Sequence, residues 1–222
     1  KNNRVQIIDS PGYADFIGEV ISSLRAVDAA VIVVDSVHSV EVGTERAWDF
    51  LEELKTPRVF FINKTDKPDA KTDQVLKGME IVFLCAGIIR GAKGIQEDPA
   101  GIIMGNLEIH SKMIHRASRA KVRRFCFISS STLYPNTGRP NVEEEGFEGS
   151  PWKPANYGIG WSNRYLETLC KHFQMTSATE YAIVRPTAIY GPFDRFDLEA
   201  GHVIPASIVK AVQRTDPYEV WG

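Results

Sequence analysis

The run Arg124–Ser129 (RFCFIS) is short and almost continuously apolar, and it ends in serine. A helical stretch, Pro99–Ala120, precedes it, and another, Asn156–Phe173, leads on to the apolar run Tyr181–Arg185. This alternation is typical of strand–helix–strand units that build a parallel sheet. The fold class that it predicts is α/β, a three-layer, Rossmann-like, doubly wound parallel sheet.

The same alternation continues toward the N-terminus. Because the strand-like runs are nearly all apolar, we expect helices to cover both faces of the sheet. Ligands of such sheets bind at the carboxyl ends of the strands, so residues that follow the strands are the candidates for function. The further strands are expected at Val5–Asp9, Ala30–Asp35, Arg58–Asn63 and Ile81–Ala86, and the helices at about Asp15–Ala26, Thr44–Leu54 and Asp73–Lys77.

The composition suits a globular protein of 222 residues, 43% of them hydrophobic, with a net charge of −2. We therefore expect no nucleic-acid or membrane partner, no signal peptide and a cytoplasmic location. The cysteines and histidines do not stand at ligand spacing, so no metal site is predicted. Cys85 and Cys126 lie in strand-like runs and are expected to be buried free thiols. Both ends of the chain look cut from something longer.

Two short motifs each follow a strand in the first third: Asp9-Ser10-Pro11-Gly12 and Asn63-Lys64-Thr65-Asp66. On them, residues of about 4–67 resemble the G domain of translational GTPases of the elongation factor G type. The resemblance implies that Asp9 holds Mg²⁺ through water, that Gly12 meets the γ-phosphate, and that Asn63 and Asp66 bind guanine. The alternative is that Asp9 and Asn63 only end strands and form turns.

The phosphate-binding loop of that family is missing, and Tyr13 stands where the family carries a catalytic histidine. Such a loop supplies most of the grip on the phosphates, so GTP hydrolysis is not expected. What remains of the resemblance is a site for GTP or GDP with Mg²⁺.

Other motifs follow one another in the rest of the chain: KGMEIVFLCAG (Lys77–Gly87), Asn106, FISSSTLYP (Phe127–Pro135) and RPTAIYGP (Arg185–Pro192). On them, residues of about 71–222 resemble the extended short-chain dehydrogenases, the NAD-dependent epimerase/dehydratase family that includes GDP-fucose synthases. The resemblance implies that Ala86, Gly87, Arg185 and Pro186 border NAD or NADP. His202–Ala206 and Glu219–Gly222 resemble parts of the substrate lobe.

The resemblance also implies the catalytic pair Ser130 and Tyr157. Tyrosine moves the substrate proton and serine orients the reacting oxygen. In the family a lysine four residues after the tyrosine lowers the tyrosine pKa, but Trp161 stands there, and an uncharged indole cannot do this. Arg164 brings charge, although it lies two turns further along the helix. A weakened or inactive enzyme is therefore expected, or Tyr157 is an ordinary residue at a helix start.

The GTPase-like piece also fits the place of the cofactor-binding half that a short-chain dehydrogenase would have before the second piece. Gly12 to Gly18 reads GxxDxxG after a strand, and Asp35 ends the next strand, where dinucleotide folds place a ribose ligand. Asn63 and Asp66 then fall near the adenine. Asp15 disfavours NAD, because it replaces the middle glycine with a negative charge.

We expect pieces 1–70 and 71–222 to pack as one domain with one continuous sheet. The expected ligand is a small-molecule nucleotide or nucleotide sugar, and a homodimer is compatible with the sequence. Three functions stay open: an NAD(P)-binding sugar-nucleotide epimerase/dehydratase-like protein, a chimeric scaffold without enzyme activity, and a guanine-nucleotide-binding fragment.

Overall fold

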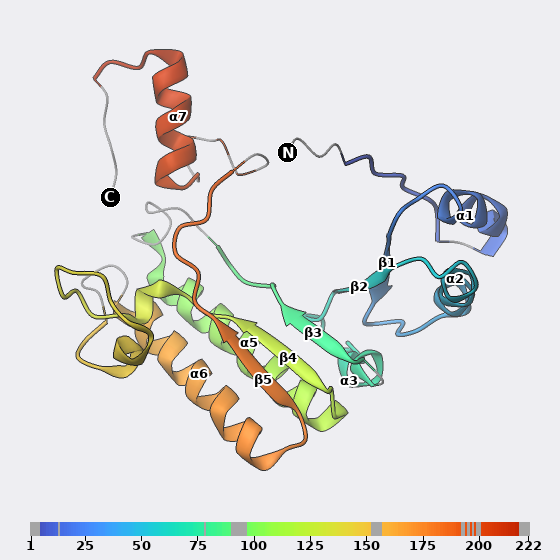
Figure 1. The fold of residues 1–222 in the computed structure, drawn as a ribbon, viewed down its shortest axis with the longest axis horizontal. Coiled ribbons are helices and arrows are strands. Elements are labelled where there is room, and N and C mark those ends of the chain that lie inside the picture. The colour runs from blue at the N-terminus through green and yellow to red at the C-terminus, as the bar shows by residue number, and fades with distance from the viewer. Residues whose placement is uncertain are drawn as a thin grey trace. The chain divides into compact units, whose positions relative to one another are not determined.

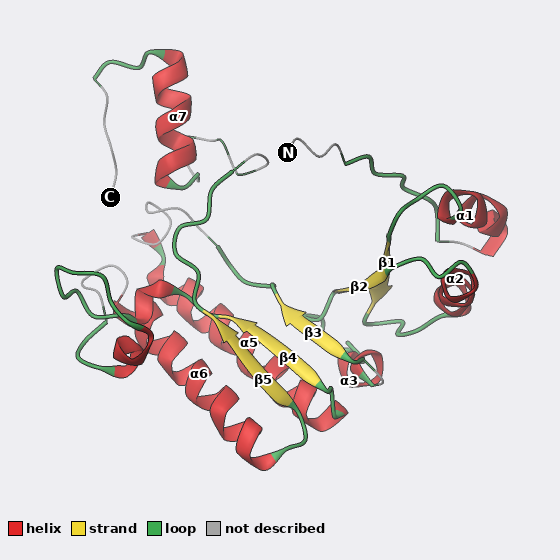
Figure 2. Cartoon of the chain, viewed as in Figure 1, coloured by secondary structure: helices red, strands yellow, loops and turns green. Residues whose placement is uncertain are grey.

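The computed structural model describes residues 5–12, 14–77, 79–89, 97–151, 157–191, 194, 196, 198 and 201–217. The chain divides into two compact units, Lys1–Gly78 and Met79–Gly222. Each unit is of mixed α/β type with parallel strands, so the predicted α/β class with parallel, Rossmann-like sheets is confirmed (Figures 1 and 2). Within the described residues, no helix is both long and apolar enough to cross a membrane.

The first unit has a two-stranded sheet. Strand β1 (Ala30–Asp35) runs parallel to β2 (Arg58–Asn63), and Asp35 and Asn63 are paired at their ends. Leu51 of α2 (Val42–Glu53) is fully buried and Trp48 stacks on Phe60 of β2, so α2 packs on the sheet. The unit's helical elements are η1 (Ala14–Phe16), α1 (Ile17–Leu24), α2 (Val42–Glu53) and α3 (Thr72–Leu76).

The strand expected at Val5–Asp9 is wrong, because these residues form no strand. Val5 is 80% exposed and Ile7 is 89% exposed. Apolar side chains are not enough to make a strand, since its backbone groups need those of a neighbouring strand. This segment pairs with no other strand in the part of the chain that the structure describes.

The second unit has a three-stranded parallel sheet in the order β3–β4–β5 (Ile81–Leu84, Arg124–Ile128, Glu180–Val184). Helix α5 (Pro99–Ala120) begins at Asp98, whose carboxylate accepts a hydrogen bond from the Gly101 amide at 2.9 Å. It ends where Lys121 turns into the left-handed region. The unit's other elements are η2 (Ser131–Leu133), η3 (Glu143–Phe147), α6 (Tyr157–Thr176) and α7 (Val203–Gln213).

The core of the second unit lies between the sheet and the pair α5 and α6, which pack on each other and along one face of the sheet (Figure 1). Crossovers between parallel strands are right-handed as a rule. The strand order β3–β4–β5 means that both crossovers move across the sheet in the same direction, which accounts for helices on the same face. The side chains that fill this core are fully or almost fully buried: Ile114, Phe125, Phe127, Leu166 and Cys170.

The expectation that both faces of the sheets are covered is wrong for the described chain. One face of β1 and β2 stays exposed at Val31, Val33 and Phe61, and one face of β3 stays exposed at Phe83. The reason is the winding, because within each unit the crossover helices lie on one side only. The described strands form two hydrogen-bonded sheets, and the single continuous sheet and single domain stay predictions.

The three cysteines of the second unit differ in exposure. Cys126 in the central strand β4 is buried, as predicted, but Cys85 is exposed because it lies just beyond the end of β3. Cys170 on α6 is also a buried free thiol.

Candidate functional site

The carboxyl ends of β3, β4 and β5 carry the loops on which most of the predicted site residues lie. Two backbone hydrogen bonds join the segment after β4 to the end of β5 and the loop that follows it: Ser129 N donates to Val184 O at 2.8 Å, and Ser131 N donates to Pro186 O at 3.1 Å. The structure therefore brings the Ser130 loop and the Arg185–Pro186 loop together. In parallel sheets this edge is where ligands bind.

Ser130 precedes the short helix η2, and its Oγ accepts two hydrogen bonds. One comes from the Thr132 amide at 3.2 Å and the other from the Thr132 hydroxyl at 3.1 Å. Asn163 of α6 donates to that Thr132 hydroxyl oxygen at 3.4 Å. None of these bonds uses the proton of the Ser130 hydroxyl, which can be donated to a ligand oxygen.

The close approach of η2 to α6 depends on Gly160. A Cβ at this position would lie 2.6 Å from the carbonyl oxygen of Thr132 and 2.4 Å from Cβ of Pro151. Only glycine leaves room for both neighbours. The sequence analysis missed this residue, although its position on the buried face of α6 was readable from the helical period.

Tyr157 is the first residue of α6 and is 43% exposed. Its ring meets that of Trp161 edge to face, with centroids 6.3 Å apart. The position of the family's lysine is thus filled by an aromatic contact, and Trp161 brings no charge to the tyrosine.

Arg164 is 3% exposed and donates to three backbone carbonyls, those of Leu133, Glu148 and Gly149, at 3.1, 2.6 and 2.8 Å. Burial lowers the pKa of this guanidinium. Its role is to fasten the loop between η2 and Pro151 onto α6. The described part of this loop is held by Arg164.

Arg185 forms a buried ion pair with Glu167 of α6. Its Nε donates to Glu167 Oε1 at 2.9 Å and its Nη2 to Oε2 at 2.7 Å. The remaining Nη1 donates to the Tyr134 hydroxyl at 2.9 Å and to the Glu143 carbonyl at 2.7 Å. Hydrogen bonding to Glu167 raises the pKa of Arg185. The guanidinium thus joins α6, the loop after β5 and the long loop after β4. The prediction that Arg185 borders the cofactor must therefore rest on its backbone and on Pro186.

The loop after β3 carries Ala86 and Gly87, both exposed. The Asn106 side chain of α5 accepts from Ile88 N at 2.7 Å and donates to Ile88 O at 3.0 Å. Nε2 of His110 lies 2.8 Å from the Ala86 carbonyl oxygen. Burial lowers the pKa of His110.

In the first unit, Asp35 and Asn63 lie side by side at the ends of β1 and β2. Asp35 Oδ2 pairs with Lys64 Nζ at 2.5 Å and with His38 Nδ1 at 3.3 Å, while Oδ1 accepts from Val37 N at 2.9 Å. The Lys64 hydrogen bond is the main reason why the pKa of Asp35 falls to about 2. The carboxylate predicted to bind ribose is therefore bound to lysine.

The remaining predicted residues of the first unit are not drawn together by any contact in the described chain. Gly12 and Gly18 have no protein atom within 4 Å of where a Cβ would stand, and Gly18 lies inside α1. Asp66 is exposed, and the Asn63 side chain accepts from the Lys64 amide at 2.9 Å. Tyr13, Asn156 and the segment Glu219–Gly222 lie outside the described residues.

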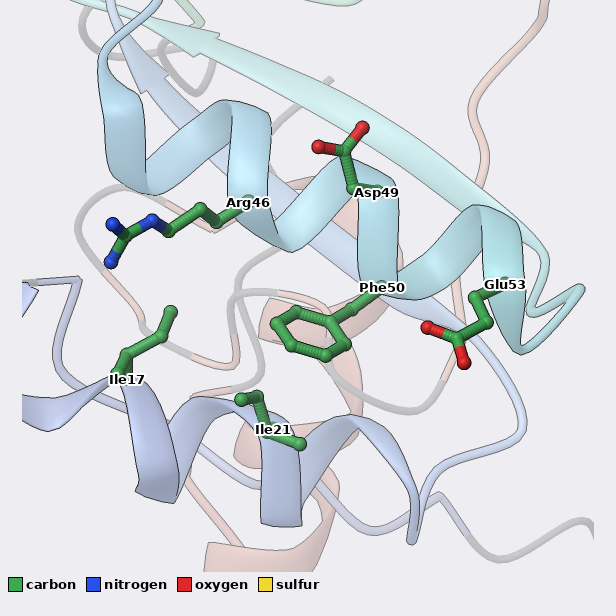
Figure 3. A pocket seen from close by; sticks show the side chains of 6 residues that line it. All are labelled: Ile17, Ile21, Arg46, Asp49, Phe50 and Glu53. Atoms are coloured by element: carbon green, nitrogen blue, oxygen red, sulfur yellow. The ribbon is translucent and has the colours of Figure 1, made fainter.

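A groove between α1 and α2 was not foreseen from the sequence (Figure 3). Ile17, Ile21 and Phe50 form its apolar part, and Arg46, Asp49 and Glu53 line it from α2. The groove carries no predicted site residue. Among the described residues, no group of three or more His, Cys, Asp and Glu side chains is placed to hold a metal ion.

These features define a class of protein by its fold, an α/β protein with Rossmann-like parallel sheets. The family model of the elongation factor Tu GTP binding domain matches residues 1–211. The chain therefore belongs to the family of the elongation factor Tu GTP-binding domain. A mitochondrial ribosome-releasing factor 2 from Meyerozyma guilliermondii is 47% identical over 76 residues, which are 34% of this chain and 9% of the relative.

The second resemblance is also supported. A GDP-L-fucose synthase from Sinorhizobium fredii is 27% identical over 216 residues, which are 95% of this chain and 62% of the relative. A GDP-L-fucose synthetase structure from Naegleria fowleri, bound to NADP, has a TM-score of 0.61 at 18% identity and covers 84% of this chain and 59% of that one, which shows the fold alone. This chain spans only part of each relative's length.

The buried ion pair generates a first prediction. Glu167 is 0% exposed and the Arg185 side chain is 13% exposed. Glu167→Gln leaves the arginine without its counter-charge, and we expect the free energy of unfolding to fall by about 3 kcal/mol in urea denaturation. The control is Glu108→Gln, which breaks an exposed pair with Lys112 and should leave stability unchanged. Equal stability of wild type and Glu167→Gln would contradict the role of the pair.

The Asp35–Lys64 pair generates a second prediction. Lys64→Gln should raise the pKa of Asp35 from about 2 toward its ordinary value of 3.8, as measured by carbon NMR of the carboxyl group. Because the folded-state pKa is lowered, the stabilisation is complete above about pH 4 and is lost as the pH falls toward the folded-state value. The control variant Lys67→Gln, in the same loop, should not change the pKa of Asp35. A wild-type Asp35 that titrates at its ordinary value would refute the pairing.

Proposed function

We propose that this protein binds a nicotinamide dinucleotide at the carboxyl edge of β3, β4 and β5 and is a weakened relative of the NAD(P)-dependent epimerases and dehydratases. The observation that carries the proposal is the hydrogen bonding of the Ser130 hydroxyl group. Its oxygen accepts two hydrogen bonds from Thr132, so its proton can be donated at the edge where ligands of parallel sheets bind.

The loop after β3 fits a dinucleotide. Ala86 and Gly87 carry no side chain beyond a methyl group, so a flat ring or a ribose can approach their backbone. The backbone groups that turn away from this surface are hydrogen-bonded to Asn106 and His110. NADP is favoured over NAD because the similar structure from Naegleria fowleri contains NADP. When bound, the nicotinamide supplies the hydride chemistry.

The substrate class proposed is a nucleotide sugar, from the similarity to a GDP-L-fucose synthase. Ser130 would hold the reacting oxygen of the sugar and Tyr157 would exchange its proton. Trp161 cannot lower the pKa of a phenol by charge, so proton transfer is weak. A cytoplasmic location and a homodimer belong to the same proposal.

A guanine-nucleotide site in the first unit is the second candidate, because the family match covers that unit. Asn63 and Asp66 would bind the guanine, and Asp9 and Gly12 would meet Mg²⁺ and phosphate. The missing phosphate-binding loop argues for weak binding of GDP or GTP and against hydrolysis. The use of Gly12, Gly18 and Asp35 for a dinucleotide is the weaker alternative, since Lys64 already binds the Asp35 carboxylate.

A nucleotide panel tests these candidates. We expect calorimetric titration to show binding of NADPH and weaker binding of NADH. If neither NADPH nor NADH binds at millimolar concentration, the main proposal is refuted. GDP should bind better than ADP if Asn63 and Asp66 read guanine, and equal binding would remove that candidate. A chain that binds no nucleotide would favour a scaffold without enzyme activity.

The catalytic pair gives a further prediction. Tyr157→Phe should lower by about 100-fold the rate at which NADP⁺ is reduced with GDP-L-fucose, because the phenol proton is lost. Trp161→Lys should raise the rate, because a lysine charge favours the phenolate. Tyr165→Phe, on an exposed position of the same helix, is the control and should change nothing. Unchanged turnover in Tyr157→Phe would exclude Tyr157 as the acid/base.

A further inference from the structure

Two side chains of α5 hold the loop that follows β3. Asn106 and His110 stand one helical turn apart on the same face of α5. Asn106 makes two hydrogen bonds to the backbone of Ile88, and His110 makes one to the carbonyl of Ala86. With three hydrogen bonds between 2.7 and 3.0 Å, the loop is fixed to the helix rather than to a neighbouring strand.

The tautomer of His110 follows from its partner. A carbonyl oxygen only accepts, so Nε2 must carry a proton. Burial lowers the pKa of His110 and so favours the neutral ring, in which Nδ1 is bare. Nδ1 is buried without a hydrogen-bond partner in the described chain, and the residue as a whole is 9% exposed. The edge-to-face contact with Phe127 of β4, with ring centroids 5.3 Å apart, fixes the plane of the imidazole. His110 is therefore a neutral donor with a single orientation.

Gly87 lies directly on these two side chains. A Cβ built there would be 3.4 Å from Asn106 Oδ1 and 3.5 Å from His110 Nε2. The loop backbone thus rests on the two polar groups, and its distance from α5 is set by them. Ala86 and Gly87 themselves are exposed.

We propose that His110 is a positioning residue for the nucleotide: it sets the height of the Ala86–Gly87 backbone at the carboxyl end of β3, and thereby the surface on which the dinucleotide lies. The inference rests on the proposed function, because it names a determinant of that same site. His110 does not touch the ligand. It acts through the Ala86 carbonyl, which turns toward α5 only while a donor stands there.

Two variants that differ by one methylene test the inference. The amide of His110→Gln reaches the Ala86 carbonyl, whereas that of His110→Asn is too short. We expect the Asn variant to bind NADPH about fivefold more weakly in fluorescence titration, which is the effect of one lost neutral hydrogen bond, and the Gln variant to bind as the wild type does. Amide exchange at Ile88, followed by mass spectrometry, should be faster in the Asn variant only.

The control is His115→Asn, on the same helix, where the ring stacks on Phe173 of α6. It should change neither the NADPH affinity nor the exchange at Ile88. A merely structural role for His110 would lower the melting temperature of both variants without separating Gln from Asn in affinity, and this result would overturn the inference.

The proposed function and this inference fail differently. If the wild type binds no dinucleotide, the proposed function is refuted, while the exchange at Ile88 still decides whether His110 holds the loop. If the wild type binds NADPH and the Asn and Gln variants bind equally well, the function stands and the positioning role is wrong. Should His110→Asn fail to fold, His110→Leu in place of Asn gives the same comparison with Gln.

Discussion

The ion pair between Glu167 and Arg185 is the contact on which the ligand edge of the second unit depends. Glu167 is fully buried, and a carboxylate removed from water needs a partner that satisfies both oxygens. Arg185 does this with two parallel hydrogen bonds and uses its remaining nitrogen to reach Tyr134 and Glu143. One guanidinium thus connects α6, the loop after β5 and the long loop after β4 by hydrogen bonds.

Arg164, one turn earlier on α6, also binds the long loop after β4. Its three hydrogen bonds go to carbonyls for which the described part of the chain shows no backbone donor, so a buried cation takes the place of such donors. The two arginines explain how an irregular segment is ordered beside the ligand edge. They also explain why neither charge is available to Tyr157, whose expected lysine is Trp161.

The two sheets share one geometric constraint. A right-handed crossover places its helix on one side of a sheet, and successive crossovers in one direction keep to that side. Each unit therefore has one well-packed face and one apolar face at which Val31, Val33 and Phe83 stay exposed. A doubly wound sheet needs strands that continue in both directions from a switch point, and neither unit supplies both directions in its described part.

Much of the fold was determined by the sequence itself. The apolar runs and helical periods predicted β1, β2 and α5 with the bounds that the structure has, because burial on a strand or a helix face leaves a direct imprint on residue order. The sequence also determined the candidate residues Ser130 and Tyr157 and the loss of the lysine at Trp161. It could not predict that Val5–Asp9 lacks a partner, because pairing depends on another segment of backbone. Only the tertiary structure decided that Asp35 is bound by Lys64, that Arg185 serves Glu167 and that His110 holds Ala86. These contacts join residues far apart in the chain, and their energies depend on burial and distance, which residue order alone does not encode.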